Sequence, residues 1–252
     1  MPIFIEEATE SRNTRVNPAL LTTLPRLAPP PPVNDGTGIE KYEVVIVGSF
    51  VSWSPILLAA ALILPPSGPT GITLAVLLAR YGITSVLTVD SKPASIPAGQ
   101  ADGLQPRTLE VLQSLDLAHE VLSQGCQMHE VGFWNPSPDG NGIVRTAFVP
   151  DISVPARYPH EVTIHQGRIE RILNEDLEKN GNKVQRGWTA TGFTLDEDDD
   201  QEFPVQVTMT GSEDSQQRVV RCKFLVGGDG AHSTIRRGMG LKLEGDTTDH
   251  IW

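Results

Sequence analysis

Two glycine-containing elements of this chain have the residue types that bind the phosphates of a dinucleotide. Gly48-Ser49 ends a β-branched run, and Gly68-Pro69-Thr70-Gly71 opens an apolar segment of helical length. Residues 50–67 separate them. Without these residues the chain reads Val-Ile-Val-Gly-Ser-Gly-Pro-Thr-Gly, which is the GxGxxG pattern whose backbone approaches a pyrophosphate at a helix N-terminus.

An acidic residue follows the glycines at a useful distance. Asp90 lies 24 positions after Gly48 once the insert is left out (90 minus 48 minus 18). A spacing of about twenty is expected for the carboxylate that accepts ribose hydroxyls. An ordinary βαβ unit with a long loop is the alternative, because a split glycine motif is weak evidence by itself.

The elements that would position these residues follow from local patterns. The β-branched run 43–47 predicts a buried strand, and the run 85–89 predicts a second one that ends at Asp90. Between them, residues 72–81 predict a helix that stops at Gly82. Strand, helix and strand make a right-handed βαβ unit with parallel strands.

Further elements are predicted downstream. Pro106 is well placed as the first residue of a helix that covers 107–115. Ile169, Ile172, Leu173 and Leu177 share one face of another helix. The alternating segments 203–210 and 218–226 predict an antiparallel hairpin or meander.

Composition narrows the class of protein. The formal net charge is −11, which argues against general affinity for nucleic acid. The two cysteines fit reduced thiols and a cytoplasmic location. The six histidines lack metal-ligand spacing, so we expect no metal site. The acidic run 196–202 is interpreted as a solvated hairpin loop.

The insert 50–67 needs its own explanation. Its apolar run 56–64 has nine residues, whereas a membrane-spanning helix needs about twenty. We hypothesise that the insert is a retained intron, in frame because its length is divisible by three. A mature transcript that still encodes residues 50–67 would refute this. If the protein carries the insert, we expect weaker pyrophosphate binding.

Four segments together resemble the class A flavoprotein monooxygenases, most closely the phenol hydroxylase branch of the aromatic hydroxylases. They are the rejoined glycine loop and the segments 99–110, 165–171 and 224–237, within a resemblance that covers about 42–252 without the insert. The resemblance implies FAD as cofactor and NADPH as cosubstrate. It also implies dioxygen as the source of one oxygen atom, inserted beside the hydroxyl of a small phenolic substrate.

The resemblance also implies residue roles. The cofactor-binding residues would be Gly48, Gly68, Pro69, Thr70, Gly71, Asp90, Ser91, Lys92, Gln100, Arg107, Gln166 and Asp229. The first five would hold the FAD pyrophosphate, and Asp229 would lie near both that group and NADPH. The alternatives are that Gln166 only caps the helix after it and that Asp229-Gly230 is a plain turn.

Asp102 is the predicted catalytic residue, because the matching aspartate of phenol hydroxylases interacts with the substrate hydroxyl. A phenolate is attacked by electrophilic oxygen faster than a phenol is, so a base near that hydroxyl helps. Burial in an apolar pocket would raise the pKa of this aspartate towards such a role. The alternative is a turn in which Asp102 bonds its own backbone.

The expected fold class is α/β: a Rossmann-like FAD-binding domain, built from a GxGxxG βαβ unit and an antiparallel β-meander, with the beginning of an interleaved α+β substrate domain. The expected divisions are a disordered Pro-rich tail at 1–40, a first part of the FAD-binding domain at 41–126, the start of the substrate-binding sheet at 127–160, and a second part of the FAD-binding domain at 161–252, ending just after the Asp-Gly motif.

Relatives in this family continue well beyond the motif at Asp229, so three functions stay open. They are an FAD-dependent aromatic hydroxylase of aromatic catabolism or fungal secondary metabolism, a catalytically inactive truncated fragment, and a non-catalytic FAD-binding module. We expect no membrane partner, and a homodimer only if a full-length enzyme exists.

Overall fold

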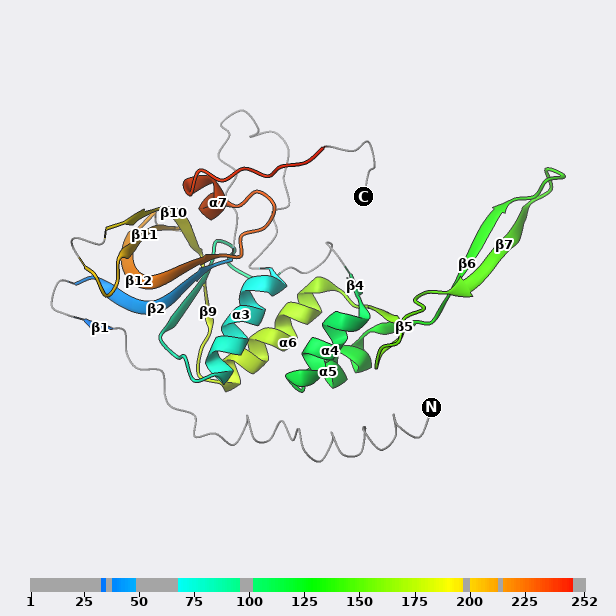
Figure 1. Ribbon diagram of the computed structural model, residues 1–252, viewed down its shortest axis with the longest axis horizontal. Helices are drawn as coiled ribbons and strands as arrows, with labels where there is room; N and C mark the ends of the chain where they lie inside the picture. The colour runs from blue at the N-terminus through cyan, green and yellow to red at the C-terminus, as the bar shows by residue number, and fades with distance from the viewer. Residues whose placement is uncertain are drawn as a thin grey trace. The chain divides into compact units, whose positions relative to one another are not determined.

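The chain is represented by a computed structural model. It describes residues 33–34, 38–48, 68–95, 102–196, 200–212 and 215–246. These residues form two compact units, one within 97–173 and the other within 27–96 and 174–252. The boundary between residues 173 and 174 falls inside helix α6 (Gln166–Lys179), which Figure 1 labels, and each unit is described by itself.

The second unit is built on one mixed sheet. Its strands run in the order β10-β11-β12-β2-β3-β9, with β1 added on β2. Their bounds are β1 Val33–Asn34, β2 Glu40–Val47, β3 Val86–Asp90, β9 Val184–Arg186, β10 Trp188–Leu195, β11 Val205–Gly211 and β12 Gln217–Gly227. Strands β12, β2, β3 and β9 are parallel, and β10, β11 and β12 form an antiparallel meander. This is the predicted combination of parallel sheet and meander.

Strands β2 and β3 confirm the predictions at 43–47 and 85–89. The side chains of Val45, Ile46 and Val47 are at most 1% exposed, as expected for a strand covered on both faces. Val47 pairs with Val89, and Val45 pairs with Leu87. The same β-branched side chains that favour an extended backbone therefore also build the core of this unit.

Helix α3 (Pro69–Arg80) connects β2 to β3 and begins three residues earlier than predicted. Pro69 suits the first helical position, because its missing N–H has no partner to lose there. Gly82, with φ +81°, follows the end of the helix as predicted. At that end Arg80 forms a buried ion pair with Asp176 of α6 (Gln166–Lys179), at 2.6 Å between Nη2 and Oδ1.

The meander confirms the predicted hairpin and adds β10, which has no clear alternation in the sequence. Its inner face packs a buried cluster that includes Val207, Met209 and Cys222. The acidic run connects β10 to β11, as predicted, and two of its described members form ion pairs, Asp200 with Lys41 at 2.8 Å and Glu202 with Lys223 at 3.3 Å. Residues 197–199 lie outside the described residues.

In its described residues, the first unit contains three helical segments and two small sheets. Its elements are β4 Gly103–Leu104, α4 Pro106–Ser114, α5 Ala118–Gln124, β5 Cys126–Met128, β6 Glu130–Pro136, β7 Ile143–Pro150, β8 Glu161–Thr163 and the N-terminal half of α6. One sheet has the order β4-β8-β5, and β6 and β7 form the other. The helix predicted from Pro106 is confirmed, and the helix predicted from the face at 169–177 is α6.

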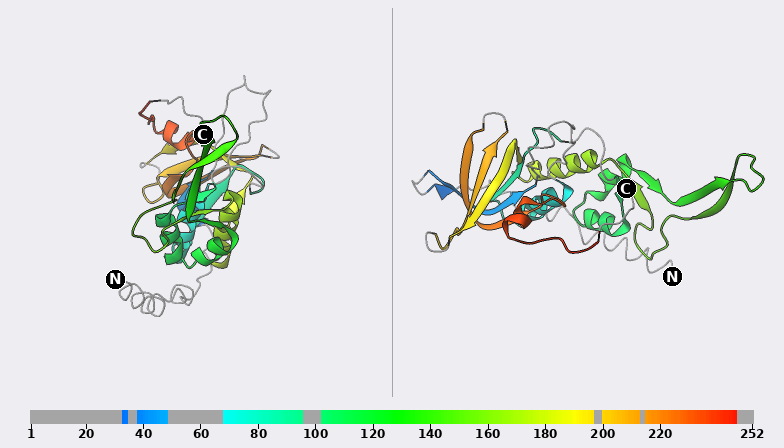
Figure 2. Two further views of the ribbon diagram at one scale, coloured as in Figure 1. Left: turned by 90° about the vertical axis from the view of Figure 1, so that its right-hand side faces the viewer. Right: turned by 90° about the horizontal axis from the view of Figure 1, so that it is seen from above.

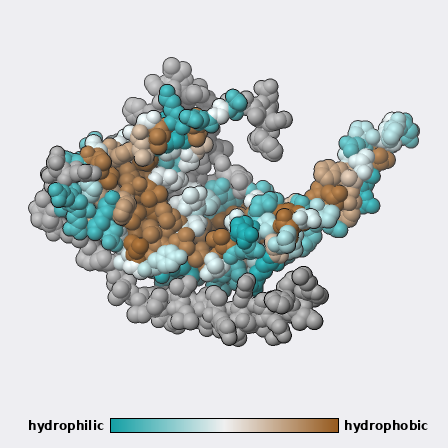
Figure 3. All heavy atoms as spheres, viewed as in Figure 1, coloured by the Kyte–Doolittle hydropathy of each residue, from teal (hydrophilic) through white to brown (hydrophobic). Residues whose placement is uncertain are grey.

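The hairpin of β6 and β7 extends away from α4 and α5 within its unit (Figure 2). Large apolar side chains are exposed along it, among them Phe133, Trp134 and Phe148 at 53 to 57% (Figure 3). This hairpin occupies most of the range 127–160, for which a role as the start of a substrate-binding sheet stays a prediction.

The N-terminal prediction needs a correction. Val33–Asn34 lie inside the range predicted as a disordered tail, yet they pair antiparallel with Lys41 and Glu40 of β2. Backbone hydrogen bonding to an existing strand edge, rather than any hydrophobic pattern, accounts for this short strand. Most of the remaining tail lies outside the described residues. Among the helices that the structure describes, none has the length and hydropathy needed to cross a membrane.

Candidate cofactor site

Three strand ends meet at the carboxyl edge of the parallel sheet. The amide of Gly48, just after β2, donates to the carbonyl of Val89 on β3 at 3.0 Å. The amide of Gly228, just after β12, donates to the carbonyl of Val47 at 2.8 Å. In open α/β sheets this edge is where ligands bind.

The two separated glycine elements come together at this edge. A Cβ built on Gly71 would lie 3.8 Å from the Cα of Gly48, so the backbones on either side of the insert are in contact. A Cβ on Gly228 would lie 3.3 Å from the Gly71 Cα and 3.6 Å from the Val47 carbonyl oxygen. The end of β2, the start of α3 and the loop at Gly228 therefore approach closely, and the contact is tightest at Gly228, where a side chain would press on the Gly71 backbone.

The N-terminus of α3 is electrostatically suited to an anion. No side chain caps it at Gly68, and its first turn carries no acidic residue. The positive end of the helix dipole is therefore not neutralised by the helix's own first turn. The exposed Thr70 and the half-buried Gly68 and Pro69 lie at this end. The glycine contacts and this terminus fit a pyrophosphate, which is the group that an FAD cofactor would bring.

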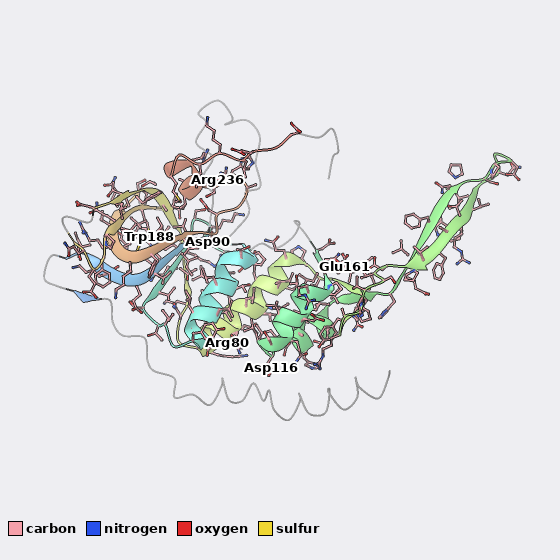
Figure 4. All side chains as sticks on the ribbon, in the orientation of Figure 1. Arg80, Asp90, Asp116, Glu161, Trp188 and Arg236 are labelled. Atoms are coloured by element: carbon pink, nitrogen blue, oxygen red, sulfur yellow. The ribbon has the colours of Figure 1, made fainter. Side chains whose placement is uncertain are left out.

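Asp90 lies at the same edge, at the end of β3, and its side chain is fully buried (Figure 4). One carboxylate oxygen accepts from the backbone N–H of Lys92 at 3.1 Å. The other accepts from Nη1 of Arg186 at 2.7 Å. Arg186 is paired with Asp90 in the β3–β9 register, and it also lines a pocket of about 300 Å³ beside Trp188.

Arg186 was missed by sequence reasoning, because β9 has only three residues and no period to recognise. The predicted contact of Asp90 with ribose stays a prediction. Lys92 contributes its backbone, and Ser91 lies half-buried between the two.

Asp229 is buried, and its carboxylate faces its own chain. One oxygen accepts from the Ser233 hydroxyl at 2.5 Å, and the other accepts from the amides of Thr234 and Ile235 at 2.6 and 3.3 Å. It therefore organises the start of α7 (Thr234–Gly238), the helix that also carries Arg236 (Figure 4). Gly230 has φ +77° and its carbonyl accepts from the Ser233 amide at 3.1 Å, so the motif contains a turn between Asp229 and α7.

The remaining predicted residues, Gln100, Asp102, Arg107 and Gln166, fall in the range of the other unit. Gln100 lies outside the described residues. Asp102 precedes β4, and its carbonyl accepts from the Ile164 amide at 2.6 Å. The residue is exposed, so the expected burial in an apolar pocket is not provided by the described part of the chain. Arg107 is 84% exposed and pairs with Glu110 one helical turn along α4.

Gln166 opens α6, but it does not cap the helix. The cap belongs to His165, whose Nδ1 accepts from the Gly167 amide at 3.0 Å. Gln166 instead donates from Nε2 to Oε1 of Glu170 at 2.9 Å. Glu170 is fully buried. The sequence did not indicate this burial, because Glu170 is one of several glutamates in the helix.

Two pKa shifts outside the candidate site are explained by the surroundings of the groups. Burial raises the pKa of the Cys222 thiol to about 12, and burial followed by the neighbouring His129 lowers the pKa of His160. The rings of His129 and His160 lie 4.5 Å apart. Within the described ranges, no group of three or more His, Cys, Asp or Glu side chains is arranged to hold a metal ion.

Comparisons with known proteins identify the family and the fold. Residues 66–252 match the family model described as an FAD binding domain. The chain is 36% identical over 244 residues to a flavin-dependent oxygenase of Aspergillus ustus, covering 93% of this chain and 35% of that protein. It is 33% identical over 191 residues to a phenol 2-monooxygenase of Aspergillus fumigatus, covering 74% and 30%.

Solved structures show the same fold. The flavin-dependent monooxygenase PieE, solved in complex with FAD and substrate, superposes with a TM-score of 0.63 at 21% identity, over 82% of this chain and 33% of that one. The chain thus spans about a third of the length of the curated relatives it matches. On the family match and the shared fold together, the chain belongs to the FAD-binding-domain family of the class A flavoproteins.

Proposed function

We propose that this chain is the FAD-binding part of an aromatic monooxygenase. The observation that carries the proposal is the convergence of Gly48, Gly71 and Gly228 at the N-terminus of α3, beside the buried Asp90. Backbone amides and an unneutralised helix terminus are suited to a pyrophosphate, and a carboxylate one strand away is suited to a ribose. The names of the matched relatives support the same cofactor and an aromatic substrate.

In the proposed reaction a phenol, dioxygen, NADPH and a proton give the ring-hydroxylated phenol, water and NADP⁺. One oxygen atom enters the ring beside the hydroxyl, the other leaves as water, and NADPH supplies two electrons. FAD supplies the oxygen activation when bound. The chain's own residues bind the dinucleotide through the glycine loop, hold the adenosine ribose at Asp90, and accept the phenol proton at a carboxylate oxygen of Asp102.

The roles of Ser91, Lys92, Gln100, Arg107, Gln166 and Asp229 in binding FAD belong to this proposal, as do NADPH and a cytoplasmic location. For Asp229 we propose an indirect role, because its carboxylate already organises the start of α7. The free thiols at Cys126 and Cys222 support a reducing compartment.

A second candidate is an FAD-binding module without hydroxylase activity. It is favoured by the exposure of Asp102, because a base that must hold a phenolate needs a site from which water is excluded. The exposed apolar hairpin of β6 and β7 points the same way, since these two strands pair only with each other among the described strands.

One experiment separates the candidates. The purified chain is titrated with FAD, and the flavin absorption band and fluorescence are recorded. NADPH oxidation is then measured with and without a panel of simple phenols. Saturable FAD binding with phenol-stimulated oxidation supports the monooxygenase, whereas FAD binding with no stimulation leaves the module. Failure to bind FAD refutes both.

A further inference from the structure

Glu170 occupies a position where an aliphatic residue would be expected. Its neighbours on the buried face of α6 are Ile169, Ile172, Leu173 and Leu177, all at most 6% exposed, and Glu170 itself is 0% exposed. Removing a carboxyl group from water is unfavourable unless its oxygens are hydrogen-bonded. A glutamate in this row therefore needs a reason beyond packing.

The hydrogen bond from Gln166 supplies a partner and fixes an orientation. The two residues are four apart, so their side chains lie over the same face of the helix. The amide nitrogen of Gln166 lies 2.9 Å from Oε1 of Glu170. The NH₂ group of Gln166, which is a donor, therefore faces the carboxyl group of Glu170. The planar amide then directs its carbonyl oxygen away from Glu170.

We propose that Glu170 is a positioning residue for FAD, which holds the amide of Gln166 in the one orientation that presents a hydrogen-bond acceptor at the start of α6. This rests on the proposed function, in which Gln166 contacts FAD. A free glutamine amide samples a broad, roughly two-fold range of terminal torsion angles. Restricting that range before binding removes an entropic penalty at the moment of binding. The matching groups on the cofactor are O–H or N–H donors.

A set of variants isolates this role. Glu170→Met removes the acceptor but fits the apolar face, and Glu170→Gln keeps an acceptor at the same reach. Gln166→Leu removes the proposed contact itself. Glu178→Met is the matched control, because Glu178 is an exposed glutamate on the same helix.

The first readout needs no cofactor. In ¹⁵N-resolved NMR spectra, the side-chain amide signals of Gln166 are identified by their loss in Gln166→Leu. We expect these protons to exchange slowly in the wild type and in Glu170→Gln, and at the rate of a free amide in Glu170→Met. A purely structural glutamate would change the melting temperature, whereas we expect Glu170→Met to melt at the wild-type temperature or above it.

The second readout is the dissociation constant for FAD from flavin fluorescence. We expect Glu170→Met to raise it about fivefold, the effect of about one net hydrogen bond. Glu170→Gln should stay within about twofold and Glu178→Met unchanged. The double variant Gln166→Leu/Glu170→Met should bind like Gln166→Leu alone, because the two residues act as one unit.

The outcomes distinguish the positioning role of Glu170 from the proposed function of the chain. Two results overturn the positioning role while leaving the proposed function intact, provided that the wild type binds FAD. One is a Glu170→Met variant with the wild-type dissociation constant for FAD, and the other is a double variant in which the effects of the two substitutions add. If Glu170→Met does not fold, a Glu170→Gln variant that binds as poorly as Gln166→Leu overturns it in the same way. A wild-type chain that binds no FAD overturns the proposed function, and this inference with it.

Discussion

Deletion of residues 50–67 should stabilise the protein and tighten its binding of FAD. The structure shows why the cut is feasible. Gly48 and Gly71 are already in backbone contact, with 3.8 Å between the Gly48 Cα and a Cβ built on Gly71. Gly68 begins the turn that contains Gly71, and its carbonyl accepts from the Gly71 amide at 3.1 Å. After the deletion Ser49 alone joins Gly48 to Gly68, a span of up to about 7 Å.

The size of the effect follows from loop closure. Residues 49–67 separate Gly48 from Gly68 in the natural chain, and one residue does so after the deletion. The closure entropy scales with the logarithm of loop length, which gives a gain of about 2 to 3 kcal/mol. For a chain of this size that corresponds to an increase in melting temperature of about 5 to 10 °C. If ordering the glycine loop is part of FAD binding, the affinity gain reaches about 30- to 150-fold.

The assay compares three proteins by thermal melting and by FAD titration. They are the natural chain, the deletion variant, and a variant in which a Gly/Ser-rich linker of the same length replaces residues 50–67. Because the argument depends on loop length, the linker variant should behave like the natural chain. A deletion variant that neither melts higher nor binds FAD more tightly would show that the two glycine elements do not form one phosphate-binding loop.

Three further changes test the packing around the site. Arg80→Met leaves the buried Asp176 carboxylate without its bidentate partner and should lower the free energy of unfolding by about 3 to 5 kcal/mol in urea titrations. Gly228→Val forces a side chain against backbone at the start of α3, and should weaken FAD binding at least tenfold while destabilising the fold by about 1 to 3 kcal/mol. Iodoacetamide at pH 8 should label the exposed Cys126 and not the buried Cys222. The free energy of unfolding should fall as the pH rises from about 9 towards 12, because the Cys222 thiolate forms at lower pH in the unfolded chain than in the folded one.

Each of these has a control or an opposing result. For the ion pair, the double variant Arg80→Met/Asp176→Leu should recover most of the lost stability, and failure to do so would mean that the arginine acts through packing alone. For Gly228, the matched glycine is Gly192, where a Cβ meets nothing within 4 Å, so that Gly192→Ala should bind FAD normally. Equal labelling of both cysteines by mass spectrometry would contradict the burial of Cys222.

The parts of the fold that sequence patterns predict are those with enough residues to show a period. The strands ending at Gly48 and Asp90 are continuous β-branched runs, and α6 places four aliphatic residues on one face. The three-residue strand β9 is too short to carry such a signal. Strand β10 mixes threonine, glycine and aromatic residues, which gives no alternation.

In the candidate site, too, some residues were predictable from the sequence and others were not. The proximity of the two glycine elements was predictable, because a phosphate-binding loop demands particular residue types at particular spacings. Arg186 and Glu170 were not, because each depends on a partner that only folding brings close. Asp229 was predicted as a cofactor-binding residue from its Asp-Gly motif. Its hydrogen bonds to Ser233 and α7 depend on a backbone turn that the amino-acid sequence alone does not specify.

The central claim is that the carboxyl edge of β12, β2 and β3, with the N-terminus of α3, binds the ADP half of FAD. The most direct measurement is an equilibrium titration of the purified chain with FAD, followed by displacement with ADP and repeated on Gly228→Val. The account predicts saturable one-to-one binding, displacement by ADP, and at least tenfold weaker binding by the variant. No FAD binding by either the natural chain or the deletion variant would contradict it, as would FAD binding that neither ADP nor Gly228→Val affects.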